Sequence, residues 1–139
     1  MARLHHVRVP SADHLHAAAF LAMLFGTEAS LPHRPEDHES VLIGSVRLMF
    51  CEAEPSGVHL AFHVTPREFD EIMARMRKNE VAYGDGPEEP VNSRVRTDDR
   101  GYGYRAIWSL SPDATLLEFF CFDRLPEGFM DPSTVVGMR

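Results

Sequence analysis

The chain has few cysteines, no long apolar run and no excess of basic residues. Only two of its 139 residues are cysteines, Cys51 and Cys121, and each lies late in an apolar stretch. We therefore expect two buried thiols rather than a disulfide or a zinc site. No apolar run approaches the roughly 20 residues that cross a bilayer. The N-terminus shows no signal-peptide pattern, so a cytoplasmic location is the default expectation.

Basic residues are outnumbered by acidic ones. The sequence has 14 Lys and Arg against 21 Asp and Glu, which gives a formal net charge of -7. Nucleic acids and anionic membranes require a basic face on a protein partner, so we expect neither as a partner. The length suits one domain, or two small half-domains that share one core.

The most informative stretch is residues 58–64, with the sequence V-H-L-A-F-H-V. It has the composition of a strand, in which successive side chains point to opposite faces. His59, Ala61 and His63 then share one face, which suits the floor of a cavity, while the other face is apolar. Buried, hydrogen-bonded imidazoles would produce the same pattern. The case for chemistry therefore depends on residues elsewhere in the chain.

The rest of the chain divides into two halves with the same order of elements. One helix is expected over residues 14–25 and ends at Gly26, and another begins with a capping box at Thr65 and ends at Asn79, the next-best left-handed cap. Residues 84–103 lack periodicity and predict a long structureless loop, a candidate lid. Strand patterns cover residues 4–9, 28–31, 39–43, 46–51, 58–64, 81–83, 104–109 and 116–122.

The two halves have a measurable repeat. His6 to Gly26 and His59 to Asn79 are both intervals of twenty residues, each from a strand histidine to a helix end. The halves also finish alike, with L-M-F-C at residues 48–51 and E-F-F-C at residues 118–121. We infer a duplicated βαβββ unit whose second copy carries the long loop.

This repeat selects His6, not His5, as the counterpart of His59, and it makes Leu48 the counterpart of Glu118. Three of the four inward positions then carry metal-ligating atoms. A buried, unpaired carboxylate costs several kcal/mol, so Glu118 within an apolar strand needs a partner. An edge strand, or a salt bridge to an arginine, would also explain this glutamate.

These residues together resemble the vicinal oxygen chelate superfamily. It includes glyoxalase I, fosfomycin-modifying enzymes, extradiol dioxygenases, methylmalonyl-CoA epimerase and bleomycin-resistance proteins. The resemblance extends over residues 4–122. It rests on Leu4-His5-His6-Val7 with Asp13, Phe25-Gly26-Thr27-Glu28, His59-Leu60-Ala61-Phe62 with Phe69-Asp70, and Pro112-Asp113 before Leu117-Glu118-Phe119.

The resemblance implies an α+β, glyoxalase-like fold. Two tandem βαβββ modules, residues 1–53 and 57–122, would form a half-open curled mixed sheet, followed by an irregular, loosely held tail at residues 123–139. It also implies the metal ligands His6, His59 and Glu118, with one divalent metal (Fe, Mn, Zn, Ni or Co) per site. In many short members two chains pair and one site combines ligands from both, so we expect a homodimer.

Three departures from the family pattern matter. The usual Asp-Pro-Asp-Gly turn is Ser111-Pro112-Asp113-Ala114 here, which alters no ligand. The fosfomycin enzymes place a tyrosine ten residues before the glutamate, where this chain has Trp108. Their phosphonate-binding arginine has no good match, because Arg124 lies in a different context. The last two differences argue against fosfomycin modification.

Further side chains are expected around the metal. Arg8 lies two residues, about 6.6 Å, from His6, and would favour an anionic substrate or form a salt bridge at the rim. Tyr104, Trp108 and Phe120 are expected to contact substrate, although Trp108 also fits the core. His63 lies roughly 13 Å from His59, which suits a surface histidine or a general base at the cavity mouth.

Two imidazoles and one carboxylate leave open coordination positions, which is a catalytic arrangement. The leading hypothesis is a divalent-metal-dependent enzyme that chelates vicinal oxygens of a small, anionic metabolite. It would be a lyase or isomerase, a dioxygenase or a thiol transferase, with Glu118 and Arg8 as catalytic residues. The alternative is a metal-free, ligand-sequestering protein of the bleomycin-resistance kind.

Overall fold

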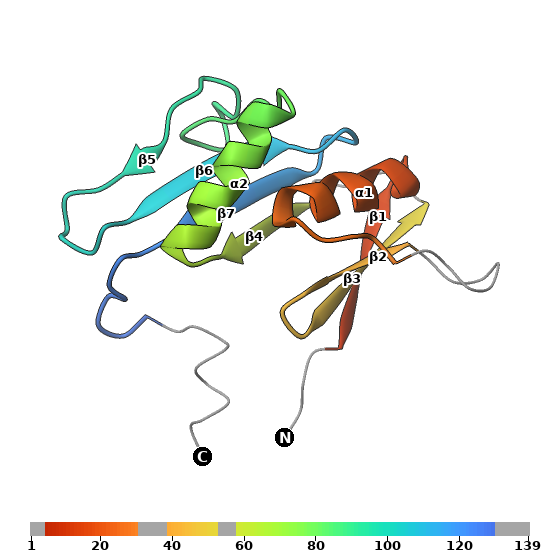
Figure 1. Cartoon of the computed structure of the whole chain (residues 1–139), viewed down its shortest axis with the longest axis horizontal. Coiled ribbons are helices and arrows are strands. Elements are labelled where there is room, and N and C mark those ends of the chain that lie inside the picture. The colour runs from red at the N-terminus through yellow and green to blue at the C-terminus, as the bar shows by residue number, and fades with distance from the viewer. Residues whose placement is uncertain (1–4, 31–38, 53–57, 130–139) are drawn as a thin grey trace, which may run out of the picture.

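The computed structural model describes residues 5–30, 39–52 and 58–129. Its elements follow the order expected of two repeated modules (Figure 1). The first half contains β1 (His6–Ser11), α1 (His14–Phe25), β2 (Ser40–Ile43) and β3 (Val46–Glu52). The second half contains β4 (His59–His63), α2 (Pro66–Lys78), β5 (Arg96–Thr97), β6 (Arg105–Leu110) and β7 (Leu116–Cys121).

The strands form two mixed sheets, one from each half. Their strand orders are β1-β3-β2 and β4-β7-β6-β5. In each sheet the first strand of the half runs parallel to the last, and the other neighbours are antiparallel. The described strands do not close into a barrel. This open α+β arrangement confirms the fold class predicted from the sequence.

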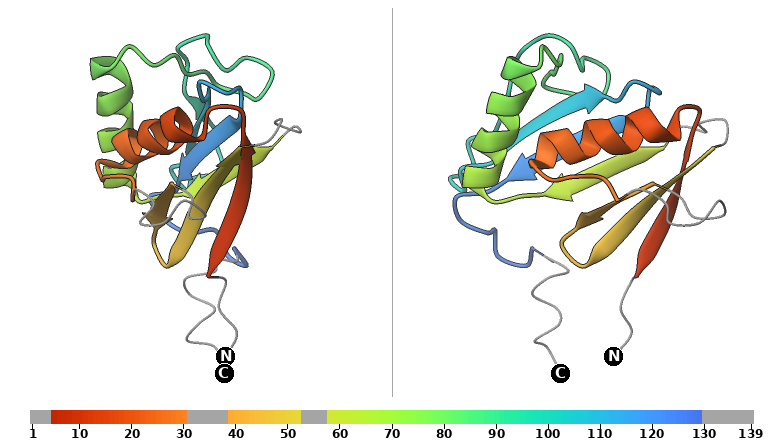
Figure 2. Two further views of the ribbon diagram at one scale, coloured as in Figure 1. Left: turned by 90° about the vertical axis from the view of Figure 1, so that its right-hand side faces the viewer. Right: turned by 45° about the vertical axis from the view of Figure 1, so that its right-hand side comes forward.

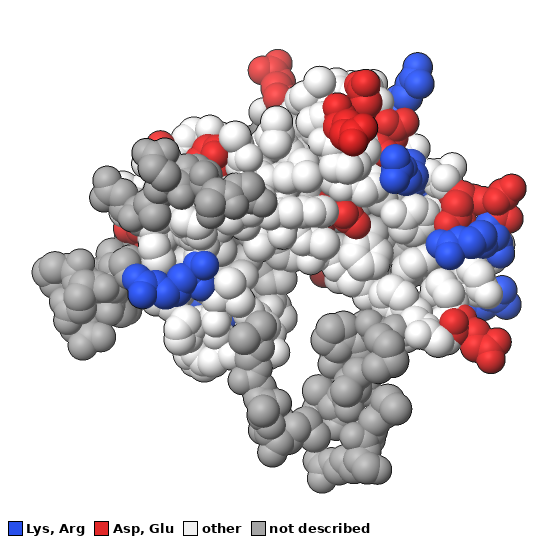
Figure 3. Space-filling view, turned by 180° about the vertical axis from the view of Figure 1, so that it is seen from behind, with Lys and Arg blue, Asp and Glu red and all other residues white. Residues whose placement is uncertain are grey.

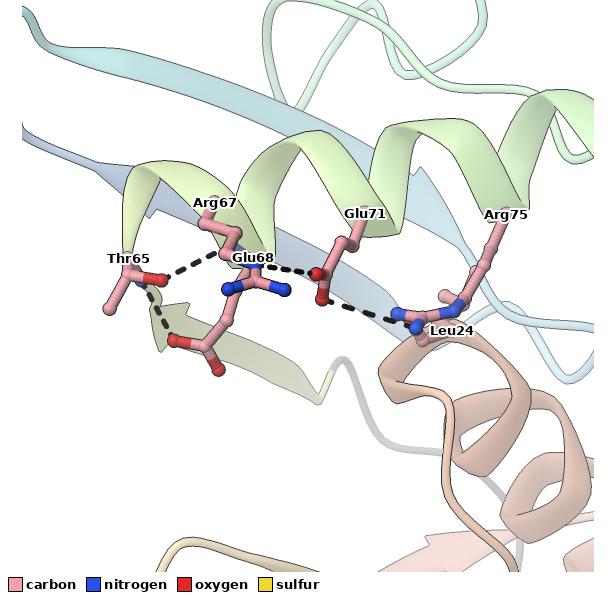
Figure 4. A network of polar contacts seen from close by, with 6 residues as sticks. All are labelled: Leu24, Thr65, Arg67, Glu68, Glu71 and Arg75. Carbon is pink, nitrogen blue, oxygen red and sulfur yellow. Dashed lines mark hydrogen bonds and ion pairs between the residues drawn. The ribbon is translucent and has the colours of Figure 1, made fainter.

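Both helices begin and end where the sequence predicts. The Asp13 carboxylate accepts from a backbone N–H at the start of α1, which ends at the left-handed Gly26. Thr65 and Glu68 form the expected capping box at the start of α2 (Figure 4). Helix α2 ends at Asn79, but this residue has a φ of -102°, and the left-handed residue is Glu80. None of the described helices is long and apolar enough to span a membrane.

The two halves share one hydrophobic core. Helices α1 and α2 lie side by side, on one side of the strands (Figure 2). The ring centroid of Phe25, at the end of α1, lies 5.1 Å from that of Phe62 and 5.7 Å from that of Phe119, and both partners are in the second sheet. Arg75 of α2 donates to the carbonyl of Leu24 at 3.3 Å (Figure 4). These contacts hold the modules together as one body.

A buried polar link also joins the two halves. The Ser11 side chain, at the end of β1, is fully buried and hydrogen-bonds the Asp113 carboxylate in the β6–β7 turn. Ser111 and Thr115 add further hydrogen bonds to the same carboxylate. Burial alone would raise the pKa of Asp113, but these hydrogen bonds outweigh burial and lower it.

The repeat register expected at the end of each half is wrong by one residue. Phe50 and Phe119 occupy equivalent ladder positions and both fill the core, with exposures of 4% and 0%. The counterpart of Glu118 is therefore Met49. Leu48 points into the core and is 6% exposed. A shift of one residue along a strand moves every side chain to the other face, so the error matters for the site.

Four expectations, for two short strands, one loop and the tail, also change. Within the described residues, the segment expected as a strand over 28–31 makes only an isolated bridge at Ser30, and no strand covers residues 81–83. The segment 84–103 is not structureless. It contains β5, and Gly84 exchanges two backbone hydrogen bonds of 2.9 Å with Trp108. Phe129, in the tail expected to be loose, packs against Phe122 with centroids 5.2 Å apart.

Candidate metal centre

The candidate residues of the second half lie on the face of its sheet that points away from α2. Alternate residues of β4, β6 and β7 fill the core, so the intervening residues share the opposite face, called here the outer face. Figure 3 views the molecule from this side, where the centre is mostly uncharged and charges of both signs gather toward β5. The outer face carries His59, Ala61, His63, Ala106, Trp108, Glu118 and Phe120.

His59 and Glu118 meet on this face. The His59 Nε2 atom lies 3.2 Å from Glu118 Oε1, and the side chains are 44% and 18% exposed. The contact crosses a gap left by Ala61, whose small side chain is the ladder partner of Glu118. Two donors that each bind one metal at about 2.1 Å lie about 3.0 to 3.4 Å apart at angles between 90° and tetrahedral. The observed spacing therefore suits two ligands of one ion, and it equally suits a simple imidazole–carboxylate pair.

His6 lies on the other sheet. It is the first residue of β1, it is exposed, and its Nδ1 lies 2.9 Å from that of His5. Within residues 5–30, 39–52 and 58–129, no three His, Cys, Asp or Glu side chains form a metal-binding group. The fold thus brings together two of the three expected ligands in one chain and leaves the third exposed elsewhere.

Arg8 accompanies His6 and not Glu118. Its Nε donates to the Cys51 thiol at 3.3 Å, and this contact raises the pKa of Arg8. The expectation of two buried thiols is right for Cys121 and wrong for Cys51, which is half-buried. Burial raises the pKa of the Cys121 thiol. Cys51 therefore belongs with Arg8 to a polar, accessible part of the first sheet.

Trp108 is the ladder partner of Glu118 on β6, and Phe120 is the next residue of β7 on the same face. Trp108 is 4% exposed, and its indole N–H is buried without an acceptor among the described residues. An unpaired buried donor costs about 1–3 kcal/mol. Tyr104 directly precedes β6, and its pKa is raised by burial first and by the charge of Glu118 second. The three expected substrate-contacting residues thus lie on one surface.

Aromatic side chains cover the end of the outer face away from His59. His63 stacks on Phe120 with centroids 5.2 Å apart, and Phe129 of the tail approaches His63 to 5.1 Å. A pocket of about 380 Å³ opens beside His63, Phe122 and the start of α2. This pocket is separate from the His59–Glu118 pair. His63 is therefore part of an aromatic cluster and not a ligand of the same centre.

The sequence did not single out Arg96, which also lies on the outer face. It pairs with Ala106 in the β5–β6 ladder, and its guanidinium carbon lies 4.8 Å above the ring centroid of Trp108. A Cβ at Gly86 would come within 3.1 Å of this guanidinium, so glycine leaves room for it. No periodicity could reveal the residue, because β5 has two residues and lies in the segment expected to be a loop.

Comparison with solved structures finds close likeness in fold. Oxidase ChaP-H1 superposes with a TM-score of 0.76 and 29% identity over 93% of this chain and 100% of that one. Oxidase ChaP-H2 has a TM-score of 0.74 and 26% identity, covering 92% and 97%. The fosfomycin resistance protein FosX from Listeria monocytogenes has a TM-score of 0.64 and 22% identity, covering 87% and 93%. No protein-family model and no curated protein matches the chain.

Proposed function

Because the chain belongs to the vicinal oxygen chelate superfamily, we propose that it is a divalent-metal-dependent enzyme. Its substrate would be a small, anionic metabolite that presents two adjacent oxygens to the metal. Oxidases are among its structural neighbours, which favours oxidative chemistry over the lyase and thiol-transfer reactions that the sequence resemblance also allows. The metal would be held by His6, His59 and Glu118.

The observation that carries this proposal is the divided donor set. His59 and Glu118 are 3.2 Å apart on the outer face of the second sheet, while His6 is exposed on the first sheet. Two copies of the chain could pair so that the first sheet of each copy lies over the second sheet of the other. Such a pairing is a two-fold, self-complementary dimer and would complete two equivalent three-ligand sites.

Exposed apolar side chains on both sheets support this dimer. Leu42 of β2 is 51% exposed and Leu110 of β6 is 44% exposed, and each shares the face that carries its sheet's candidate ligand. Burial of such side chains is worth roughly 25 cal/mol for each Å² removed from water. An interface over these faces would therefore stabilise the dimer and enclose the metal.

Two imidazoles and one carboxylate leave two or three coordination positions free, as a catalytic metal requires. When bound, the ion would supply a Lewis acid that polarises the substrate oxygens. Glu118 would orient its ligand oxygen from a position 18% exposed, between Ala61 and Trp108. Arg8 lies on the same strand as His6, so it would enter the same site and stabilise negative charge that develops on the substrate.

Metal analysis of purified protein tests the proposal. Wild type should retain about one Zn²⁺, Mn²⁺ or Fe²⁺ per chain after dialysis against excess metal-free buffer. His59→Ala and Glu118→Gln should each lose most of it, because either change removes one of three ligands. His16→Ala is the matched control, since this histidine is 60% exposed on α1. Wild type that holds no more metal than His59→Ala would favour a metal-free binding protein instead.

A further inference from the structure

We propose that Arg96, held over the ring of Trp108, is an anion anchor that selects substrates with a carboxylate distant from the chelating oxygens. The inference rests on the proposed function, because the other end of the same substrate would bind the metal beside Glu118. It assigns a specificity-determining role to a residue outside the expected ligand set. Arg96 lies on the second sheet, in the same chain as the His59 and Glu118 of its site. Arg8 lies on the first sheet and would come from the partner chain.

Among the described residues Arg96 has no carboxylate partner, whereas Arg100 and Arg105 of the same half each have one. Arg100 lies 2.7 Å from Asp98, and Arg105 lies 2.7 Å from Asp70. The guanidinium carbon of Arg96 instead lies over the Trp108 ring, 4.8 Å from its centroid. Stacking of this kind fixes a guanidinium while leaving its N–H edge free for a bidentate contact.

The surroundings of Arg96 keep it in place. Gly86 leaves room for the guanidinium, because a Cβ there would come within 3.1 Å of Arg96 Nη2 and the arginine would have to shift. The ring beneath it is rigid, since Trp108 is 4% exposed and its backbone is paired on both sides, with Gly84 and with β7. A charge on a fixed support loses little conformational freedom when it binds an anion.

The position on the sheet sets the size of the substrate. Neighbouring strands are about 4.8 Å apart, so β5 lies about 10 Å from β7. Trp108 stands between them, directly opposite Glu118. A molecule that bridges most of this distance could chelate the metal beside Glu118 and present its far end to Arg96, which covers the buried indole ring. Because the guanidinium fork matches a planar oxyanion, that far group is a carboxylate.

A pair of matched probes tests the anchor. 3,4-Dihydroxybenzoate carries two adjacent oxygens and a distant carboxylate, and 3,4-dihydroxybenzamide replaces the carboxylate with a neutral group of the same shape. Affinities would be measured by calorimetry on full-length, Zn²⁺-loaded protein without oxygen. Wild type should bind the benzoate at least tenfold more tightly than the benzamide. In Arg96→Gln this preference should fall to twofold or less, with the affinity for the benzamide unchanged.

Arg67→Gln is the charge-matched control, because Arg67 is 89% exposed on α2 and pairs with Glu71. It should keep the preference of the wild type. Retention of the preference in Arg96→Gln, or its absence in wild type, would overturn the anchor while leaving the metal site intact. Protein that holds no stoichiometric metal would contradict the proposed function, and the anchor would be rejected with it.

Discussion

The two modules present the same strand order, but their outer positions carry different chemistry. Each begins with a strand histidine, His6 or His59, twenty residues before a helix end. Two residues further along the ladder the second module has Glu118, whereas the first has Met49. The difference indicates that only a mixed pair, one first sheet against one second sheet, gives two imidazoles and a carboxylate. Two first sheets would give two imidazoles and no carboxylate, and two second sheets would give two imidazoles and two carboxylates.

The largest expected effect comes from placing a glutamate at each of the two residues considered as the counterpart of Glu118, namely Leu48 and Met49. Leu48→Glu should destabilise the fold by about 3–5 kcal/mol or more, because it places a carboxylate in the core at a site 6% exposed. Met49→Glu should cost less than about 1 kcal/mol, because the Met49 side chain is half-buried, on the face of the first sheet opposite to Leu48 and Phe50. Urea unfolding at neutral pH measures both.

The Met49→Glu variant also tests the comparison between the two modules. Met49→Glu would place a carboxylate two ladder positions from His6, as Glu118 is from His59, with Arg8 in the place of Ala61. The variant should then retain metal when His59→Ala is added, at reduced affinity. Equal destabilisation by the two single changes would show that the ladder register of the first module is not as described.

A smaller effect is expected at the polar link between the modules. Asp113→Ala should destabilise by about 1–2 kcal/mol at pH 7, since Ser11, Ser111 and Thr115 lose an ionised acceptor. The folded-state pKa of Asp113 is lowered, so its contribution is complete above the unfolded value of about 3.9. It is lost as pH falls through the folded value.

The difference in unfolding free energy between wild type and Asp113→Ala should therefore be constant near neutral pH and shrink as pH falls below about 4. Chemical unfolding at several pH values measures it. Asp98→Ala is a suitable comparison, because the pKa of Asp98 is also lowered, by Arg100, but the pair is exposed and lies within one module. A pH-independent difference for Asp113→Ala would contradict the proposed link.

Local signals made most of the fold predictable. The capping box at Thr65, the left-handed Gly26 and the helix end at Asn79 are chemical requirements that a sequence displays directly. The strand histidines and the twenty-residue interval gave the duplication. The alternation around His59 and Glu118 correctly put both on one face.

The remaining features depend on tertiary contacts. Aligning Cys51 with Cys121 predicted that Leu48 is the counterpart of Glu118. The packing of Phe50 and Phe119 in the core shows a different register. Arg96 escaped notice because a two-residue strand has no period to detect. The separation of His6 from the other two candidate ligands follows from how the two sheets are placed, which strand patterns do not encode.

Mixing two variants tests most directly the proposed metal site shared between two chains. His6→Ala and His59→Ala would each be purified, combined, unfolded and refolded together, and analysed for bound Zn²⁺. If one site takes His6 from one chain and His59 with Glu118 from the other, a mixed dimer has one complete site. Metal content should then rise from near zero in each variant to about one ion per mixed dimer. No recovery, with wild type recovering fully after the same treatment, would contradict a site shared between two chains.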